Sequence, residues 1–310
     1  MPAVAYFLGI DGGGSNTTCV LGDEKSVLGS VTVGGSNIVR LGESTVRTAL
    51  QQGVREVCRK AAIKPRQIVA ICAGIAGAAR EDIRKQVTDI LATLAPAQIE
   101  VLGDMVIAHE AVLGSGAGIA VLAGTGSIAY GRHATGRIAR AGGWGYAISD
   151  EGSGHWIGVQ AVAAVTHALD SGSYTKLSDR ILGHWGVHSY DDLICRANTS
   201  PLPDFAGLFP VVLAAAEAGD PYGHDILARA GVELAGLAQM VYRRLWRAGD
   251  QVDVGLAGGI FENSDEVRHS FGRELRSSIP QVHVFLSTAS PAEGALSLAR
   301  KLTSAGQMNF

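Results

Sequence analysis

The stretch Asp11-Gly12-Gly13-Gly14-Ser15-Asn16-Thr17-Thr18 is the part of the sequence that indicates the fold most clearly. Residues 4–10 before it are apolar and β-prone, and residues 17–21 resume that pattern after it. A run of glycines ends a strand and supplies a tight turn. The sequence therefore predicts a strand, a glycine turn and a second strand.

The residue types in this turn suit a bound phosphate. Three consecutive glycines let main-chain N–H groups approach a bulky anion, and the hydroxyls of Ser15 and Thr17 can add donors. Asp11, at the end of the first strand, can hold Mg²⁺ through water. An ordinary hairpin needs none of this, so we interpret the turn as a nucleotide phosphate site. No G-x-x-x-x-G-K-[ST] motif is present and the glycines lead into a strand, which disfavours P-loop and Rossmann sites.

The same pattern of strand, glycine turn and strand recurs in the middle of the chain. Residues 119–123 form another apolar run, Gly124-Thr125-Gly126-Ser127 another glycine turn, and residues 128–132 another β-prone run. Two such units, each opening one half of the chain, predict two related α/β domains with a cleft between them. We expect an N-terminal domain over residues 1–113 and a C-terminal domain over residues 114–291.

The rest of the chain supplies helices and further strands. Apolar residues at spacings of three and four indicate helices, and short β-prone runs indicate strands. The further strands expected are 26–33, 67–74, 98–102, 251–256 and 282–286, and the helices are 44–62 (capped by Ser44), 80–94, 105–113, 156–169, 178–183, 190–197, 205–218 and 223–248. The second domain would thus carry a helical insertion, and a last helix over 292–302 could pack back on the first domain.

Composition excludes several classes of protein. Of the 310 residues 47% are hydrophobic and 18% charged, which is typical of a globular chain. The formal net charge of −3 offers no electrostatic footprint for nucleic acid or an anionic membrane. No apolar stretch approaches the roughly 18 residues of a membrane span, so we expect a cytoplasmic protein. The four cysteines lack metal-ligand spacing and are expected to be small core residues.

The order of these pieces resembles the acetate and sugar kinase, Hsp70 and actin superfamily. Residues 11–18, 123–127 and 255–263 (GLAGGIFEN) match its two phosphate motifs and its adenosine motif. Within it, the chain is similar to the BadF/BadG/BcrA/BcrD ATPase-like branch, which holds N-acetylglucosamine kinases and ATPase activators of 2-hydroxyacyl-CoA dehydratases. The most specific match is GGWG at 142–145 followed by SDEGS at 149–153, whereas residues 171–204 match nothing. The resemblance implies two duplicated actin-like (ribonuclease H-like) domains, an interdomain active-site cleft and a homodimer.

Site residues follow from the same resemblance. ATP is expected to contact residues of all three motifs, which are Gly12, Gly13, Gly14, Ser15, Asn16, Thr17, Gly124, Thr125, Gly126, Gly258 and Gly259. The last two glycines would let the adenine ring lie flat against the main chain. Mg²⁺ would be held at Asp11.

Asp104 is the expected catalytic base. It follows the predicted strand 98–102, and ligands of open α/β folds gather beyond the carboxyl ends of strands. A sugar hydroxyl that attacks a γ-phosphate needs an acceptor for its proton, and the resemblance assigns that role to Asp104. Asp is also a preferred N-cap, so Asp104 could cap a helix that begins at Met105, and both roles could coexist.

The resemblance also implies the residues that line the sugar: Asn37, Thr125, Gly143, Trp144 and Asp150. Planar polar groups bind sugar hydroxyls, and an indole ring covers apolar ring C–H groups. Asn37 could instead only form a turn, and Asp150 could only cap the helix that starts near Gly154.

The implied activity is an ATP- and Mg²⁺-dependent transfer of the γ-phosphate to the 6-hydroxyl of N-acetyl-D-glucosamine. Glucosamine, glucose and N-acetylmuramic acid stay open as acceptors, because acetyl-pocket residues are not identifiable by spacing. Two other classes share the phosphate turns. An ATPase activator needs clustered cysteines that this chain lacks, and a nucleotide-switched binding module would not need a positioned Asp104 or a sugar-lining Trp144.

Overall fold

The computed structural model describes residues 4–78 and 80–306, and the chain divides into two compact units. The first unit runs to Ser115 and resumes at Ala289, and the second runs from Gly116 to Thr288. The sequence placed these divisions after residues 113 and 291. The C-terminal helix α12 (Pro291–Gly306) packs against strand β1 and helix α4 of the first unit.

A five-stranded sheet forms the centre of the first unit, in the order β3-β2-β1-β4-β5. Its strands are β1 (Tyr6–Gly12), β2 (Asn16–Gly22), β3 (Val27–Gly34), β4 (Ile68–Ile75) and β5 (Gln98–Leu102). The central strand β1 pairs antiparallel with β2 and parallel with β4. The first glycine turn therefore joins two neighbouring strands at the edge where β1, β4 and β5 all end.

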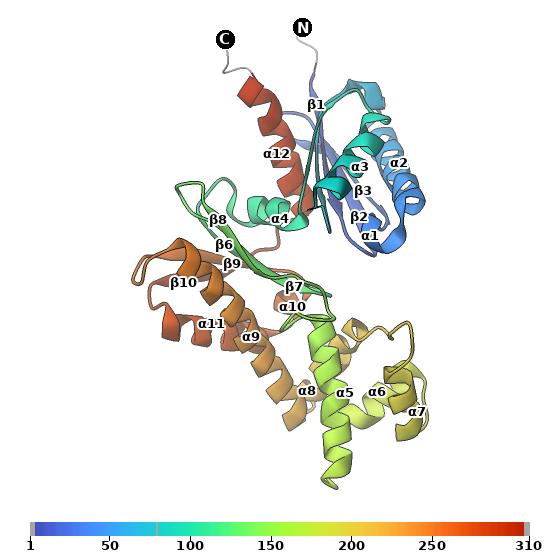
Figure 1. Ribbon diagram of the computed structural model, residues 1–310, viewed down its shortest axis with the longest axis vertical. Coiled ribbons are helices and arrows are strands. Elements are labelled where there is room, and N and C mark those ends of the chain that lie inside the picture. The colour runs from blue at the N-terminus through green and yellow to red at the C-terminus, as the bar shows by residue number, and fades with distance from the viewer. Residues whose placement is uncertain (1–3, 79, 307–310) are drawn as a thin grey trace. The chain divides into compact units, whose positions relative to one another are not determined.

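Helices cover both faces of this sheet (Figure 1). They are α1 (Ile38–Leu41), α2 (Glu43–Lys60), α3 (Glu81–Ala92), α4 (Asp104–Leu113) and α12, with a short 3₁₀ turn η1 (Pro65–Gln67). Alternate residues of β1 point to opposite faces, as in any strand. Leu8 and Ile10 join one buried cluster with residues of α2 and α3, whereas Phe7 joins another with α4 and α12.

The second unit repeats this sheet, in the order β8-β7-β6-β9-β10 when read from the other edge. Its strands are β6 (Gly118–Ala123), β7 (Ser127–Arg132), β8 (Ile138–Gly142), β9 (Val252–Ala257) and β10 (Val282–Leu286). As in the first sheet, the leading strand β6 pairs antiparallel with β7 and parallel with β9. The predicted internal duplication of an α/β domain is confirmed.

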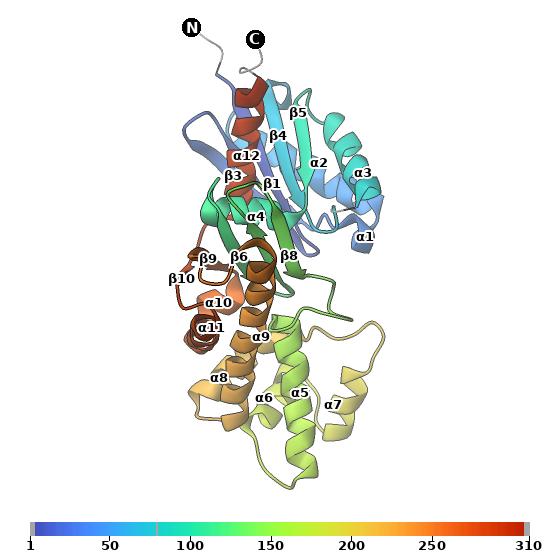
Figure 2. The same ribbon diagram turned by 60° about the vertical axis from the view of Figure 1, so that its left-hand side comes forward.

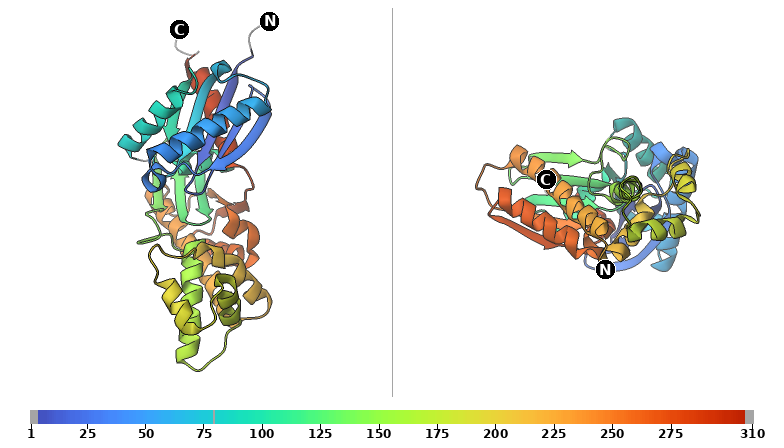
Figure 3. Two further views of the ribbon diagram at one scale, coloured as in Figure 1. Left: turned by 90° about the vertical axis from the view of Figure 1, so that its right-hand side faces the viewer. Right: turned by 90° about the horizontal axis from the view of Figure 1, so that it is seen from below.

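The helices of the second unit fall into two groups (Figure 2). The insertion between β8 and α9 consists of α5 (Gly154–Asp170), α6 (Lys176–Trp185), α7 (Tyr190–Ala197), η2 (Ala206–Leu208) and α8 (Phe209–Glu217). The others are α9 (Pro221–Leu245), α10 (Gly259–Asn263) and α11 (Asp265–Ser278). Figure 3 shows α9 and α11 side by side, and α9 packs on β6, β7 and β8.

Several local expectations were wrong. Strand β8 was not predicted, because its sequence IARAG has only one β-branched residue and depends on pairing with β7. Helix α11 was also missed, although Val267, Phe271 and Leu275 give it a buried seam at every fourth residue. Helix α2 begins at Glu43 with Gly42 as its N-cap, so Ser44 lies inside the helix.

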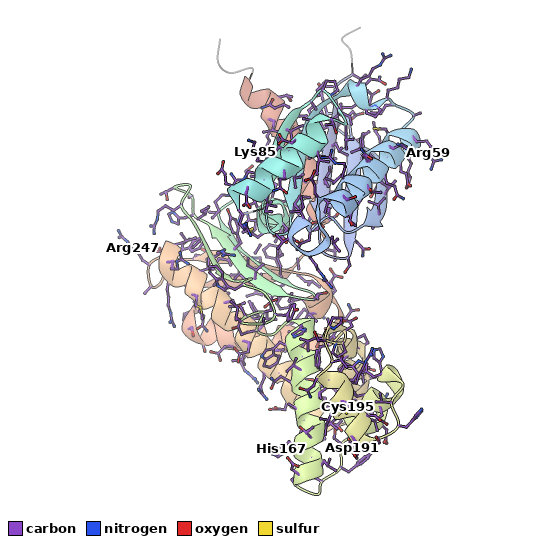
Figure 4. All side chains as sticks on the ribbon, turned by 45° about the vertical axis from the view of Figure 1, so that its right-hand side comes forward. Arg59, Lys85, His167, Asp191, Cys195 and Arg247 are labelled. Atoms are coloured by element: carbon purple, nitrogen blue, oxygen red, sulfur yellow. The ribbon has the colours of Figure 1, made fainter. Side chains whose placement is uncertain are left out.

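One cysteine also departs from the expected core position. Cys19, Cys58 and Cys72 are buried, but Cys195 on α7 is exposed (Figure 4). Within residues 4–78 and 80–306, no helix is long and apolar enough to cross a membrane.

Candidate functional site

The first glycine turn is fastened to the segment that follows β3. The N–H of Gly13 donates to the carbonyl of Asn16 at 2.9 Å, and the carbonyl of Gly13 accepts from the N–H groups of Ser36 (2.9 Å) and Asn37 (3.1 Å). The Thr17 hydroxyl is buried and donates to the hydroxyl of Ser36 at 2.8 Å. Thr17 therefore shapes the turn, and its hydroxyl proton is not free for the phosphate it was expected to bind.

The three glycines of this turn differ in their surroundings. A Cβ atom at Gly12 would overlap the side chains of Ser36 and Ile75, so this position is glycine because of packing. A Cβ atom at Gly13 would meet only the Asn16 carbonyl, at 3.5 Å. Gly13 thus has free space beside its Cα atom, next to the exposed residues Ser15 and Asn16, although its own N–H and carbonyl are bonded within the protein.

A basic side chain that the sequence analysis missed lies beside the turn. The guanidinium of Arg40 reaches to 3.1 Å from the Cβ position of Gly14, and Arg40 is exposed. No motif marks this residue, because it lies more than twenty positions beyond the turn in the short helix α1. A positive charge at this point suits an anionic ligand.

Asp11 and Asp104 lie near each other at the carboxyl edge of the first sheet. Burial, and secondarily the negative charge of Asp104, raises the pKa of Asp11 to about 6. Burial also raises the pKa of Asp104, against the lowering effect of main-chain hydrogen bonds from Met105 and from Asp104 itself. The ends of β1 and β5 thus bring together two partly desolvated carboxylates, which make good proton acceptors and good cation ligands.

The expectation that Asp104 could be the N-cap of a helix beginning at Met105 is wrong. Helix α4 begins at Asp104 itself, and Gly103 is its N-cap. One carboxylate oxygen of Asp104 accepts from the N–H of Met105 at 3.0 Å. This bond fixes the side chain but occupies only part of its capacity, because an ionised carboxylate offers about four acceptor sites.

Asn37 is the N-cap of helix α1. Its side-chain oxygen accepts from the N–H of Arg40 at 3.2 Å, so the turn-forming role is present. The cap uses the amide oxygen and leaves the NH₂ group out of that bond. Gly77, which the chain places beside Asn37, has a φ of 89° that favours glycine.

In the second unit, the second glycine turn is fastened to the start of α5. The N–H of Gly124 donates to the carbonyl of Gly126 at 2.9 Å, and the N–H groups of Gly154 and His155 donate to the carbonyls of Gly124 (2.8 Å) and Thr125 (3.2 Å). Nothing lies within 4 Å of a Cβ atom placed at Gly124, and Thr125 is exposed. Gly124 therefore corresponds to Gly13 as the open position of its turn.

Asp150 lies against this turn. Its Oδ2 atom is 2.9 Å from the Cβ position of Gly126, and the residue is 8% exposed with a φ of 71°. Burial raises the pKa of Asp150, although main-chain hydrogen bonds from Ser127 and Gly145 act in the opposite direction. The helix-cap alternative is wrong, because Ser153 caps α5 and accepts from the N–H of Trp156 at 3.2 Å. A strained, buried carboxylate next to a glycine turn is typical of a functional site.

Trp144 is exposed on the surface near Asp150. It is 63% exposed, and it follows Gly143, whose φ is 69°. The guanidinium carbon of Arg140 lies 3.8 Å from the centre of the indole ring. One face of the ring is thereby covered, and the exposed remainder is an apolar surface of the kind that sugars stack on.

The turn after β9 has one packed and one open glycine. Gly258 has a φ of 100°, and a Cβ atom there would lie 2.5 Å from the carbonyl of Ala123 on β6. Gly259 has only the side-chain nitrogen of Asn263 nearby, at 3.9 Å. Of the two glycines expected to contact adenine, Gly259 is the one with open space.

The next feature is the set of carboxylates that could bind a cation. Among the residues that the structure describes, no group of three or more His, Cys, Asp or Glu side chains could hold a metal ion. Mg²⁺ is usually bound by one or two carboxylates together with substrate phosphates rather than by a protein cage. Asp11 fits that pattern, since a divalent charge would stabilise its ionised form, which burial and secondarily the charge of Asp104 disfavour.

Comparison with known proteins shows which family the chain as a whole resembles. The model of the BadF/BadG/BcrA/BcrD ATPase family matches residues 8–299. An N-acetylmuramic acid/N-acetylglucosamine kinase from Clostridium acetobutylicum is 35% identical, over 95% of this chain and 98% of the relative. An N-acetyl-D-glucosamine kinase from Dictyostelium discoideum is 29% identical over 94% and 97%. A crystal structure from Chromobacterium violaceum, provisionally assigned as an N-acetylglucosamine kinase, superposes with a TM-score of 0.79 at 25% identity, over 96% and 100% of the two chains.

Proposed function

This chain belongs to the BadF/BadG/BcrA/BcrD ATPase family, and from that premise we propose that it is an ATP-dependent kinase that phosphorylates the 6-hydroxyl of N-acetyl-D-glucosamine. The relatives that carry such names match nearly the whole chain. The observation that supports the proposal best is the half-buried carboxylate of Asp104, which lies near Asp11 beside the first glycine turn.

In the proposed reaction Asp104 accepts the proton of the sugar hydroxyl. The hydroxyl oxygen forms a bond to the γ-phosphorus, the bond between that phosphorus and the β,γ-bridging oxygen breaks, and ADP leaves. Its raised pKa makes the Asp104 carboxylate a stronger proton acceptor than an exposed aspartate. The bond from Met105 fixes the side chain and limits the orientations from which it can accept the proton.

The phosphates are assigned to the open main-chain positions. Gly13 and Gly124 leave room for the triphosphate, and Arg40 adds a positive charge beside the first turn. Asp11 would hold Mg²⁺, which would neutralise phosphate charge when bound and leave the Asp104 carboxylate to accept the proton. Thr125, Trp144 and Asp150 of the second unit, together with Asn37, are assigned to the sugar. Gly259 is assigned to the adenine ring.

A coupled ADP-release assay over a panel of hexoses and amino sugars tests this function. We expect turnover with N-acetylglucosamine that Asp104→Asn lowers by a factor of at least about 100, with ATP binding retained. Asp89→Asn, an exposed aspartate of α3, is the matched control and should turn over normally. Full activity of Asp104→Asn would remove this residue from the mechanism, and no turnover of any sugar by the wild type would reject the kinase assignment.

A further inference from the structure

Residues 143–149, here called the Trp144 loop, join strand β8 to the segment before helix α5. Trp144 and Tyr146 are both exposed, so the loop leaves large apolar side chains in solvent. Gly143 and Gly145, on either side of Trp144, have φ angles of 69° and 97°. Glycine adopts such angles without strain, but it has more conformational freedom to lose than other residues. The loop backbone therefore does little by itself to hold the indole ring in one position.

Contacts from the segment that follows hold the loop instead. The carboxylate of Asp150 accepts a hydrogen bond from the N–H of Gly145. The ring of Tyr146 packs against the ring of His155, with 4.8 Å between the ring centres and 40° between the ring planes. His155 thus acts on the loop at a position two residues beyond Trp144.

His155, the second residue of α5, is itself fixed on two further sides. Its N–H donates to the carbonyl of Thr125 in the second glycine turn, at 3.2 Å. Its ring meets the ring of Phe205 edge to face, with 5.3 Å between the ring centres. Phe205 belongs to the buried core of the second unit. His155 therefore connects this core and the second glycine turn to the exposed ring of Tyr146.

The His155 side chain is an uncharged aromatic ring at neutral pH. Burial lowers the pKa of His155 below its usual 6.5, although the negative charges of Asp150 and Asp204 act in the opposite direction. Its contacts with Tyr146 and Phe205 are therefore ring contacts, of a kind that a phenyl group can also make. Phenylalanine is accordingly the conservative replacement at this position.

We propose that His155 is a positioning residue whose ring, packed against Tyr146, holds the Trp144 loop in the conformation that receives the sugar. A loop that is ordered before the sugar arrives has less conformational entropy to lose on binding, so the sugar binds more tightly. The γ-phosphate and the proton acceptor are not involved in this effect. This inference rests on the proposed function, in which Trp144 and Asp150 contact the sugar.

The alternative is that His155 serves only the packing of α5. Its replacement would then lower the stability of the whole second unit, and the Trp144 loop would be no more affected than its surroundings. The two roles differ in whether the loop responds selectively and in whether the effect passes through Tyr146.

Steady-state kinetics with N-acetylglucosamine provide the first test. We expect His155→Ala to raise KM for the sugar about threefold to tenfold, with kcat and KM for ATP within about twofold of the wild type. His155→Phe should restore most of the loss, because it retains the ring contacts. His167→Ala is the matched control, since His167 lies on the same helix about 18 Å further along (Figure 4), and it should change none of these constants.

A second variant tests whether the effect passes through Tyr146. In a Tyr146→Ala background the contact with His155 is already lost, so adding His155→Ala should raise KM no further. Tyr146 is exposed, so Tyr146→Ala should fold normally.

Hydrogen exchange of the ligand-free protein measures the loop directly. The N–H groups of Ile148 and Ser149 donate to the carbonyl of Gly145 at 3.1 and 2.9 Å, so their exchange reports whether the loop is ordered. We expect His155→Ala and Tyr146→Ala to accelerate exchange in residues 143–149 about threefold to tenfold, and His155→Phe to leave it close to the wild type.

Several outcomes would overturn the inference. These are an unchanged KM for the sugar in His155→Ala, an equal rise in His155→Phe, or a further rise when His155→Ala is added to Tyr146→Ala. Lower global stability with unchanged exchange in the loop would assign His155 to the packing of α5. If His155→Ala does not fold, accelerated loop exchange in Tyr146→Ala is required. If the wild type turns over no sugar, the kinase function fails, and hydrogen exchange in the same variants decides whether His155 positions the loop.

Discussion

Asp11 and Asp104, far apart in the sequence, lie close enough in the folded chain for the charge of Asp104 to raise the pKa of Asp11. They reach this position because β1 and β5 run parallel to the intervening strand β4 and end at the same edge of the sheet. Two desolvated carboxylates in one place disfavour each other's ionised form. The fold tolerates this cost at the edge where a divalent cation and phosphates would relieve it.

Replacing Asp11 should stabilise the metal-free protein in a pH-dependent way. The pKa of Asp11 is raised from 3.8 to about 6 in the folded chain, so ionisation is costlier there than in the unfolded chain. The cost is absent below about pH 4, grows between pH 4 and 6, and reaches at most about 3 kcal/mol above pH 6. We expect Asp11→Asn to raise the free energy of unfolding at pH 8 by up to that amount and to leave it unchanged near pH 4.

Urea denaturation in the presence of EDTA measures this effect. Asp89→Asn on the surface of α3 is the control, and its effect on the free energy of unfolding should not follow this pH course. An Asp11→Asn variant that is no more stable than the wild type at pH 8 would contradict the assigned burial cost.

The glycines of the two turns should separate into ligand-binding and packing positions. Gly13→Ala and Gly124→Ala place the new methyl group in open space, so they should change the free energy of unfolding by less than about 0.5 kcal/mol. The same methyl groups would obstruct phosphates, and we expect ATP affinity to fall at least about tenfold. Calorimetric titration with ATP and denaturation curves give the two quantities.

Gly12→Ala is the matched contrast for the first turn. Its methyl group would overlap Ser36 and Ile75, so we expect a loss of about 1–3 kcal/mol of unfolding free energy. Normal ATP affinity in Gly13→Ala and Gly124→Ala would argue against phosphate binding at these turns.

Substitutions of Asp150 should separate its charge from its backbone conformation. Asn accepts a φ near 71° more readily than most residues, so Asp150→Asn should fold normally. Loss of the charged acceptor should raise KM for the sugar by about tenfold to a hundredfold with little change in the affinity for ATP. Asp150→Ala should show the same defect and also lose about 1 kcal/mol of stability. An unchanged KM for the sugar in both variants would place Asp150 outside the sugar site.

The attachment of α12 should depend on an ion pair between the buried carboxylate of Glu110 and the half-exposed Lys301. The side chain of Glu110 on α4 is 2% exposed, contacts Lys301 of α12 and accepts from the hydroxyl of Ser297 at 3.0 Å. Lys301→Met removes the positive partner of a buried carboxylate, so we expect a loss of about 2 kcal/mol of unfolding free energy, with the half-exposed lysine keeping the effect moderate. The double variant Glu110→Met/Lys301→Met should recover most of it. Denaturation curves that show additive losses would disprove this coupling.

The sequence predicted the elements whose signals are local. Strands β1 and β2 and strands β6 and β7 are apolar runs broken by glycines, so both hairpins and the duplication were visible in the printed residues. Strand β8 has no comparable run, because its stability comes from pairing with β7. Element prediction failed for this strand because the neighbour across the sheet, rather than the segment itself, determines its conformation. Helix α11 is a different case, since its buried seam of Val267, Phe271 and Leu275 was present in the sequence and was overlooked.

Individual site residues depended on contacts that no spacing reveals. Thr17 carries a hydroxyl in a phosphate-like motif, yet that hydroxyl donates to Ser36 in the interior. In the sequence Asp150 is a candidate N-cap, but in the structure Ser153 is the N-cap of α5. Arg40 has no motif at all and reaches the first turn only because the segment after β3 folds back on Gly13.

The sequence by itself determined that two glycine turns each follow a leading strand, because turn chemistry and strand periodicity act over a few adjacent residues. Only the tertiary structure decided which glycines in those turns have open space beside them, that Asp11 lies near Asp104, and that Arg140 covers one face of Trp144. Those outcomes depend on how side chains from separate strands and helices exclude one another when they pack.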